Sequence, residues 1–101
     1  MTKIQYKIGK EECILRVEGH AGYAEKGKDI VCAGISALCN ALYRATFTAN
    51  AIIQNETADS FFLLRATEHG SDVRAMYSMA VLGFNDIAAE YPDFVKVEKI
   101  F

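Results

Sequence analysis

Hydrophobic residues in this chain follow two different periods, and this restricts the possible folds more than any other feature. Short runs alternate apolar and polar residues, as in residues 4–8 and 13–17, which is typical of strands with one buried face. Two longer segments, residues 30–51 and 73–91, repeat their apolar residues at helical spacing, which is typical of helices with one buried stripe. The sequence therefore predicts a small sheet combined with two helices.

The expected order of elements is β-β-α-β-α-β. The first two strands form a hairpin around the turn Gly9–Glu12, and the last strand covers residues 94–100. The run Phe61–Leu64 is apolar throughout, so we expect a central strand buried on both faces. The polar stretch Gln54–Ser60 is interpreted as a loop, and residues 69–72 as a turn. This order predicts an α+β two-layer sandwich, in which both helices cover one face of a small mixed or antiparallel sheet.

Both helices are expected to pack through apolar stripes. Asp29 precedes the first helix as its N-cap, because a carboxylate can accept hydrogen bonds from the free amides of the first turn. The second helix is expected to direct six residues toward the core, namely Met76, Met79, Ala80, Phe84, Ile87 and Ala88.

Composition and charge argue against several classes of protein. The chain has 101 residues, three cysteines, 11 basic residues and 13 acidic ones, for a net charge of −2. An odd number of cysteines without a CxxC pattern indicates free thiols in a reducing cytoplasm. Because positive charge is not clustered, neither nucleic acid nor a membrane is expected as a direct partner. We expect neither a signal peptide nor a membrane span, since no apolar run reaches about 18–20 residues.

The segment Gly19–Ser36 carries the residues suited to chemistry. Cys32 lies in the first turn of the expected helix, where unpaired amides and the helix dipole favour a thiolate, the nucleophilic form. The same amides are placed to bind the oxyanion that forms when a carbonyl is attacked. His20 follows the second strand and is a suitable proton acceptor for the thiol. Strand alternation would direct His20 away from the buried face, unless Gly19 ends or bulges the strand.

The residues alone leave other interpretations open. A lone cysteine in a helix is usually a small buried apolar residue, and Cys13 and Cys39 fit the core stripes. No metal is expected, because His20 and the three cysteines match no zinc-ligand spacing. A redox pair of Cys32 and Cys39 is disfavoured, because seven helical residues separate them by about 10.5 Å and a disulfide needs Cα atoms within about 7 Å.

The run Gly19-His20-Ala21, followed by Gly27, then Asp29-Ile30-Val31-Cys32-Ala33 and Ser36, resembles the signature of the Prp family. These are ribosomal-processing cysteine proteases of certain bacteria. The resemblance covers essentially the whole chain in length and order of elements, and it implies one cysteine-protease domain over residues 1–101.

The resemblance also implies roles for individual residues. Cys32 corresponds to the nucleophile and His20 to the general base, and Asp29 and Ser36 correspond to polar residues kept beside them. A mobile loop over residues 21–28 is expected, with Gly19, Gly22, Tyr23 and Gly27 as its marked residues. In this interpretation Tyr23 helps to form a pocket for a large substrate side chain, and Asp29 can orient His20 if the geometry permits.

The activity that the resemblance implies is removal of a short N-terminal extension from the precursor of large-subunit ribosomal protein twenty-seven. Family members are cytoplasmic homodimers without a metal or cofactor, so the same is expected here. A non-catalytic protein-binding module in ribosome biogenesis is the alternative.

Overall fold

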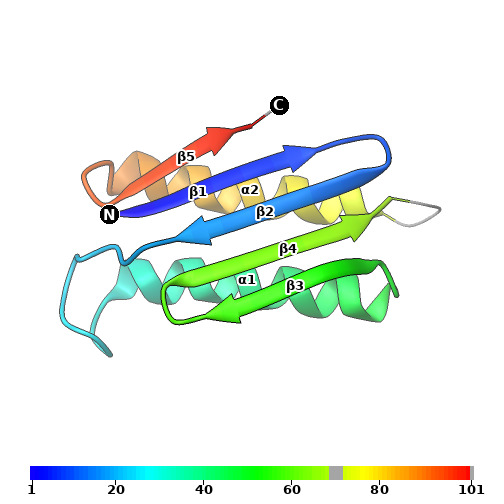
Figure 1. The fold of residues 1–101 in the computed structure, drawn as a ribbon. Coiled ribbons are helices and arrows are strands. Elements are labelled where there is room, and N and C mark those ends of the chain that lie inside the picture. Colours follow the sequence, from blue (N-terminus) through cyan, green and yellow to red (C-terminus); the bar gives the residue numbers. More distant parts are fainter. Residues whose placement is uncertain (69–71, 101) are drawn as a thin grey trace.

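The computed structural model describes residues 1–68 and 72–100. It contains one five-stranded mixed sheet with two helices on one of its faces (Figure 1). The predicted α+β fold class is therefore confirmed. In chain order the elements are β1 (Thr2–Ile8), β2 (Glu12–Glu18), α1 (Ile30–Thr48), β3 (Ile52–Ala58), β4 (Phe61–Thr67), α2 (Val73–Glu90) and β5 (Val95–Lys99).

The strand order in the sheet is β3-β4-β2-β1-β5. The pairs β1–β2, β2–β4 and β3–β4 are antiparallel, whereas β5 is parallel to β1. The parallel pair arises because α2 carries the chain back along the sheet before β5 begins. Helix α1 packs against β4, and α2 packs against β1, β2 and β5. The two helices also contact each other, so they form a continuous second layer.

The stretch Gln54–Ser60 is not a loop, and that expectation was wrong. Most of it belongs to β3, which pairs with β4 at the edge of the sheet. Most side chains of β3 are exposed, and this strand has a neighbour on only one side because it lies at the edge of the sheet. Polar side chains on an edge strand also discourage pairing with other chains. The strand therefore lacks the apolar alternation by which a half-buried strand is recognised.

Strand β4 is central, but it is buried on one face only. Phe62, Leu64 and Ala66 are buried beneath the helices, whereas Phe61 and Leu63 are half-buried on the opposite face. The expectation of burial on both faces was wrong, because both helices lie on the same side of the sheet.

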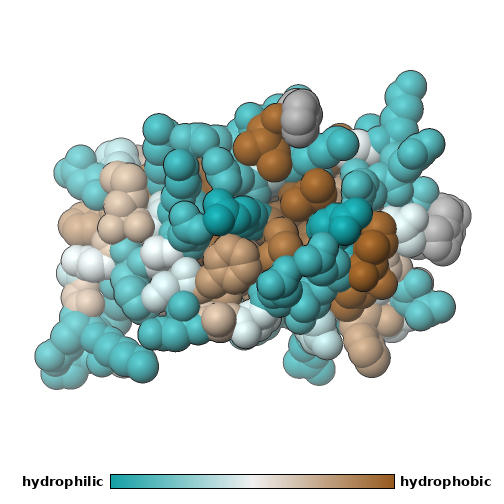
Figure 2. Space-filling model, in the orientation of Figure 1, coloured by the Kyte–Doolittle hydropathy of each residue, from teal (hydrophilic) through white to brown (hydrophobic). Residues whose placement is uncertain are grey.

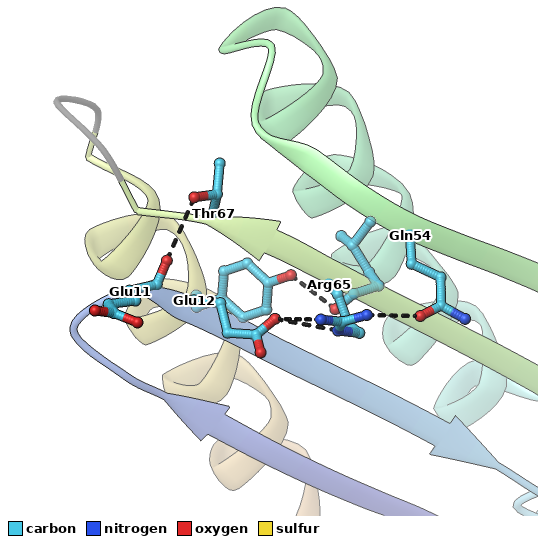
Figure 3. Close-up of polar contacts among 7 residues, drawn as sticks. Glu11, Glu12, Gln54, Arg65 and Thr67 are labelled. Carbon is cyan, nitrogen blue, oxygen red and sulfur yellow. Dashed lines mark hydrogen bonds and ion pairs between the residues drawn. The ribbon is translucent and has the colours of Figure 1, made fainter.

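Polar contacts between strands cover the open face of the sheet. Arg65 on β4 forms an ion pair with Glu12 on β2 at 2.9 Å and donates a hydrogen bond to Gln54 on β3 at 3.0 Å (Figure 3). Hydrophilic side chains dominate this face, with a smaller hydrophobic group between them (Figure 2). Because the ion pair is about one third exposed, it fixes strand register more than it adds stability.

Helix α1 begins directly after Asp29, as predicted, and buries one stripe of residues: Val31, Ile35, Cys39, Leu42 and Thr46. It ends at Thr48, before the expected residue 51, and Asn50 follows in the left-handed region with φ 53°. Asparagine tolerates this conformation, which stops a helix. Contrary to expectation, α1 is long and apolar enough by length and composition to cross a membrane. This is weak evidence, because a helix that buries one stripe against a sheet has the same composition.

Five of the six residues of α2 that were predicted to face the core do pack there, namely Met76, Ala80, Phe84, Ile87 and Ala88. The prediction did not include Tyr77. Tyr77 is fully buried and its hydroxyl donates a hydrogen bond to the carbonyl oxygen of Leu64 at 2.8 Å, and burial raises the pKa of Tyr77. Phe84 is also fully buried, as predicted, whereas Met79 is 66% exposed and was wrongly placed in the core. The predicted turn at residues 69–72 lies mostly outside the described residues.

We expect Phe84→Ala to lower the free energy of unfolding by roughly 3–5 kcal/mol, because it leaves a cavity between α2 and the sheet. Met79→Ala, on the exposed side of the same helix, is the matched control and is expected to change stability by less than about 0.5 kcal/mol. Urea denaturation of both variants measures the difference. Equal losses would contradict the assignment of the buried stripe.

Candidate active site

Three segments that are distant in the sequence meet at one end of the sheet. They are the end of β2, the beginning of α1, and the turn Asp59–Ser60 between β3 and β4 (Figure 1). The connection between β2 and α1 passes beside them at the left of the view. The expected site residues come from the first two segments, and the hairpin turn brings residues that the sequence did not indicate.

Gly19 ends β2 and redirects the chain before His20. Its φ of +93° lies in the left-handed region, and a Cβ atom at this position would lie 2.5 Å from the carbonyl oxygen of Met1. The N–H of Gly19 donates a hydrogen bond to the carbonyl oxygen of Ser60 at 2.8 Å. Because the strand stops here, the alternation of side chains along β2 does not determine the direction of the His20 side chain. His20 lies beside a cavity that Cys32 also lines.

Two cavities adjoin at this end of the molecule. The strand-side cavity, of about 310 Å³, lies between the end of β2, helix α1 and the β3–β4 hairpin. The loop-side cavity, of about 520 Å³, lies between the β2–α1 connection and the start of α1. Four residues line both cavities: His20, Cys32, Ser36 and Asp59. The structure therefore places His20, which follows β2, at the same cavities as Cys32 and Ser36 on α1, and the sequence had singled out all three.

Asp29 joins the β2–α1 connection to the helix. One carboxylate oxygen accepts hydrogen bonds from the N–H groups of Val31 and Cys32, both at 3.0 Å. The other accepts from the N–H groups of Tyr23 at 3.1 Å and Ala24 at 3.4 Å. The pKa of Asp29 lies below its ordinary value, chiefly because of the Cys32 N–H, with further contributions from Ala24, the Cys32 thiol and Tyr23. The predicted N-cap is confirmed.

The bonds of Asp29 change two expectations. Its carboxylate faces backbone amides, and His20 is not among its hydrogen-bond partners in the described part of the chain. Asp29 therefore does not orient His20. The amides of Val31 and Cys32 were expected to be open to an oxyanion, but they already donate to Asp29. A substrate oxyanion needs donors elsewhere in the site.

Tyr23 does not line either cavity. Its ring contacts Tyr91 and Phe94 edge-on, with centroid distances of 5.2 and 5.4 Å. In this conformation the ring packs against the connection between α2 and β5. A role of Tyr23 in a substrate pocket, which supposes closure of the loop over a peptide, stays a prediction. Gly22 and Gly27 do line the loop-side cavity, and both have positive φ. The β2–α1 connection is thus fixed by the hydrogen bonds of Asp29 and by the packing of the Tyr23 ring.

The three cysteines lie in different environments. Cys13 and Cys39 are buried, as predicted. Desolvation raises the pKa of Cys13 and raises that of Cys39 to about 12, so both remain thiols. Cys32 is partly exposed and lines both cavities. Among residues 1–68 and 72–100, no group of three or more His, Cys, Asp or Glu side chains is arranged to hold a metal ion.

Sequence reasoning missed three polar residues of the site: Asn40, Asp59 and Ser60. Asn40 lines the strand-side cavity one helical turn beyond Ser36, and the spacing 32, 36, 40 was the available signal. The hydroxyl of Ser60 lies 2.5 Å from Nε2 of His20. Asp59 and Ser60 were overlooked because their surroundings were interpreted as a loop instead of a hairpin.

Comparison with known proteins gives a consistent result. The family described as cysteine protease Prp matches residues 1–96. A curated relative from Mycoplasma genitalium, named ribosomal processing cysteine protease Prp, is 28% identical over 92% of this chain and 94% of its own length. The protein of the same name from Mycoplasma pneumoniae is 26% identical over 83% of this chain and 84% of its own.

Solved structures share the fold. The ribosomal processing protease Prp from S. aureus, in complex with a covalently linked product peptide, superposes with a TM-score of 0.82 at 20% identity, covering 98% of this chain and 99% of its own. SMU.848 from Streptococcus mutans superposes with a TM-score of 0.73 at 25% identity, covering 98% of this chain and 93% of its own.

Gly19→Ala is expected to destabilise the fold by about 1–3 kcal/mol, because it combines an unfavourable φ with a collision against Met1. Gly22→Ala is the matched control, since Gly22 also has a positive φ but nothing lies within 4 Å of an added Cβ. Urea denaturation should show the larger loss for Gly19→Ala. Equal losses in the two variants would mean that the close approach to Met1 does not matter.

Iodoacetamide is expected to modify Cys32 in the folded protein and to leave Cys13 and Cys39 intact. Cys32 is partly exposed whereas the other two are buried, and burial disfavours their thiolate forms. Peptide mapping by mass spectrometry identifies the modified residue. Unfolding in urea provides the control, in which all three cysteines react. Labelling of Cys39 in the folded state at the rate of Cys32 would refute this assignment.

Proposed function

This chain belongs to the cysteine protease Prp family, and we propose that it removes the N-terminal extension from the precursor of large-subunit ribosomal protein twenty-seven. Membership of the family makes the chain a cysteine protease. The identity of the substrate rests on the resemblance between Gly19–Ser36 and the family signature. We further propose that residues 1–101 act as one catalytic domain.

One observation carries the assignment of the catalytic residues. Cys32 and His20 line the same two adjoining cavities, although twelve positions separate them in the sequence. The other two cysteines are buried. A partly exposed thiol and an exposed imidazole that border the same cavities suit nucleophilic catalysis by cysteine. Cys32 is therefore the nucleophile in this proposal, and His20 is its base.

The reaction would follow the sequence general to such pairs. His20 accepts the proton of the Cys32 thiol, and the thiolate attacks the scissile carbonyl carbon, so that a C–S bond forms and the carbonyl oxygen becomes an oxyanion. The C–N bond then breaks, and His20 returns the proton to the leaving amine. Water hydrolyses the thioester, which releases the N-terminal extension and restores the thiol.

Stabilisation of the oxyanion falls to groups other than the first-turn amides, because those of Val31 and Cys32 donate to Asp29. Ser36 lies one helical turn beyond Cys32 and lines both cavities. Its hydroxyl is a hydrogen-bond donor on the same face of α1 as the nucleophile. Ser36 is the oxyanion donor in this proposal.

A peptide substrate is supported by solved relatives. The S. aureus protease has been solved with a covalently linked product peptide and with a substrate peptide. By analogy, the precursor would lie across the strand-side and loop-side cavities. Action on a ribosomal protein before assembly implies a cytoplasmic enzyme. Large apolar side chains exposed on the two helices, at Phe47, Met79 and Leu82, support the homodimer that the resemblance implies.

Incubation of the protein with the ribosomal precursor of the same organism tests the proposal. The wild type is expected to shorten the precursor at one bond, as measured by mass spectrometry. Cys32→Ala should abolish cleavage, and His20→Ala should slow it by roughly 10²- to 10⁴-fold, because proton transfer is lost. Cys13→Ala is the control variant, since Cys13 is buried and lines neither cavity.

Cleavage that survives in Cys32→Ala would reject the proposed nucleophile. A wild type that binds the precursor without cutting it would reject this substrate and favour the binding-module alternative.

A further inference from the structure

The end of β2 is tied to the β3–β4 turn through a single residue, Ser60. Its carbonyl oxygen accepts a hydrogen bond from the N–H of Gly19 at 2.8 Å. Its hydroxyl lies 2.5 Å from Nε2 of His20. The first contact holds the backbone at Gly19, directly before His20, and the second holds one nitrogen of the His20 ring. Within the described residues, Ser60 is the only hydrogen-bond partner of the His20 ring.

Ser60 occupies a backbone conformation that disfavours serine. Its φ is +62°, in the left-handed region that glycine, asparagine and aspartate enter more readily. A turn selected only for its backbone would be more stable with glycine at this position. A serine here is explained by its side chain, which reaches a residue forty positions away in the sequence.

The hydrogen bond between Ser60 and Nε2 affects which tautomer the neutral His20 ring adopts. A neutral imidazole carries a proton on one nitrogen and a lone pair on the other. When the Ser60 hydroxyl accepts a hydrogen bond from Nε2–H, Nδ1 keeps the lone pair. That is the nitrogen left to take a proton from Cys32. If the hydroxyl instead donated to Nε2, Nδ1 would carry the proton and could not act as the base.

We propose that Ser60 is a positioning residue that accepts a hydrogen bond from Nε2–H of His20, fixes the ring and its tautomer, and leaves Nδ1 as the base for Cys32. This rests on the proposed function, in which His20 is that base. The thiol proton moves from Sγ to Nδ1, and Nδ1 later returns it to the leaving amine. The Nε2 proton and its bond to Ser60 remain in place throughout, so the imidazolium that forms is also stabilised by the hydroxyl.

Three substitutions of Ser60 distinguish the catalytic effect of its hydroxyl from the effect of the turn backbone on stability. Ser60→Gly removes the hydroxyl and relieves the positive φ, so it should raise the melting temperature while it lowers kcat by about 10- to 100-fold, with KM unchanged. Ser60→Ala should lower kcat equally without the gain in stability. Ser60→Asn tolerates the same φ and keeps a side-chain acceptor, so it should restore part of kcat. A merely structural role predicts that activity follows stability, which Ser60→Gly contradicts if the proposal holds.

Two measurements do not need the precursor. Nitrogen-15 NMR of the imidazole should show the Nε2–H tautomer of His20 in the wild type and a mixture in Ser60→Gly, with the His20 signals assigned by their loss in His20→Ala. Ser60→Gly should also slow alkylation of Cys32 by iodoacetamide about tenfold. In the His20→Ala background it should have no further effect, because the two residues act as one unit.

The outcomes distinguish the two proposals. If the wild type leaves the ribosomal precursor intact, the substrate assignment fails, while alkylation and NMR still decide the role of Ser60. A kcat within twofold of the wild type in both Ser60→Gly and Ser60→Ala overturns the positioning role. An equal effect of Ser60→Gly on the alkylation of Cys32 in the wild type and in His20→Ala overturns it as well. Cleavage that survives Cys32→Ala but is lost in Ser60→Ala overturns both proposals and makes Ser60 the nucleophile.

Discussion

The site depends on the close approach of three backbone segments at Gly19. Its missing side chain lets the end of β2 pass the carbonyl oxygen of Met1, where a Cβ atom would lie at 2.5 Å. Its N–H is bonded to Ser60 in the β3–β4 turn. This junction ends the alternation of β2 and brings His20 beside α1. The position of the imidazole therefore follows from a backbone constraint that spans β1, β2 and the β3–β4 hairpin, and not from local strand geometry.

A second constraint acts on the other side of the site, at Asp29. A single carboxylate satisfies two amides at the start of α1 and two in the preceding connection. This anchors the connection to the helix that carries Cys32. It also uses the amides that a helix N-terminus ordinarily offers to an anion. Asp29 thus positions Cys32, but it also occupies the backbone amides that could otherwise stabilise an oxyanion. Side chains such as Ser36 therefore become more important as oxyanion donors.

The differences between prediction and structure have a common cause. Hydrophobic periodicity reports which side of an element is buried, and it fails where burial is slight or is decided by distant neighbours. Strand β3 has almost no buried side chains because it lies at the sheet edge. Met79 has the spacing of a buried helical stripe, but spacing does not show which side of the helix meets the sheet. The packing of α2 on β1, β2 and β5 leaves Met79 exposed. Tyr23 is apolar enough for a pocket, but in this conformation its ring contacts Tyr91 and Phe94.

The sequence by itself determined the two-layer arrangement, the cap at Asp29, the burial of Cys13 and Cys39, and the segment in which His20 and Cys32 lie. These depend on local capping and on residue periodicity, which are readable along the chain. Only the tertiary structure decided that His20 and Cys32 border the same cavities, and that the partner of His20 is Ser60 instead of Asp29. The reason is that β3 and β4 fold back beside β2, and this contact between residues forty positions apart leaves no periodic trace in the sequence.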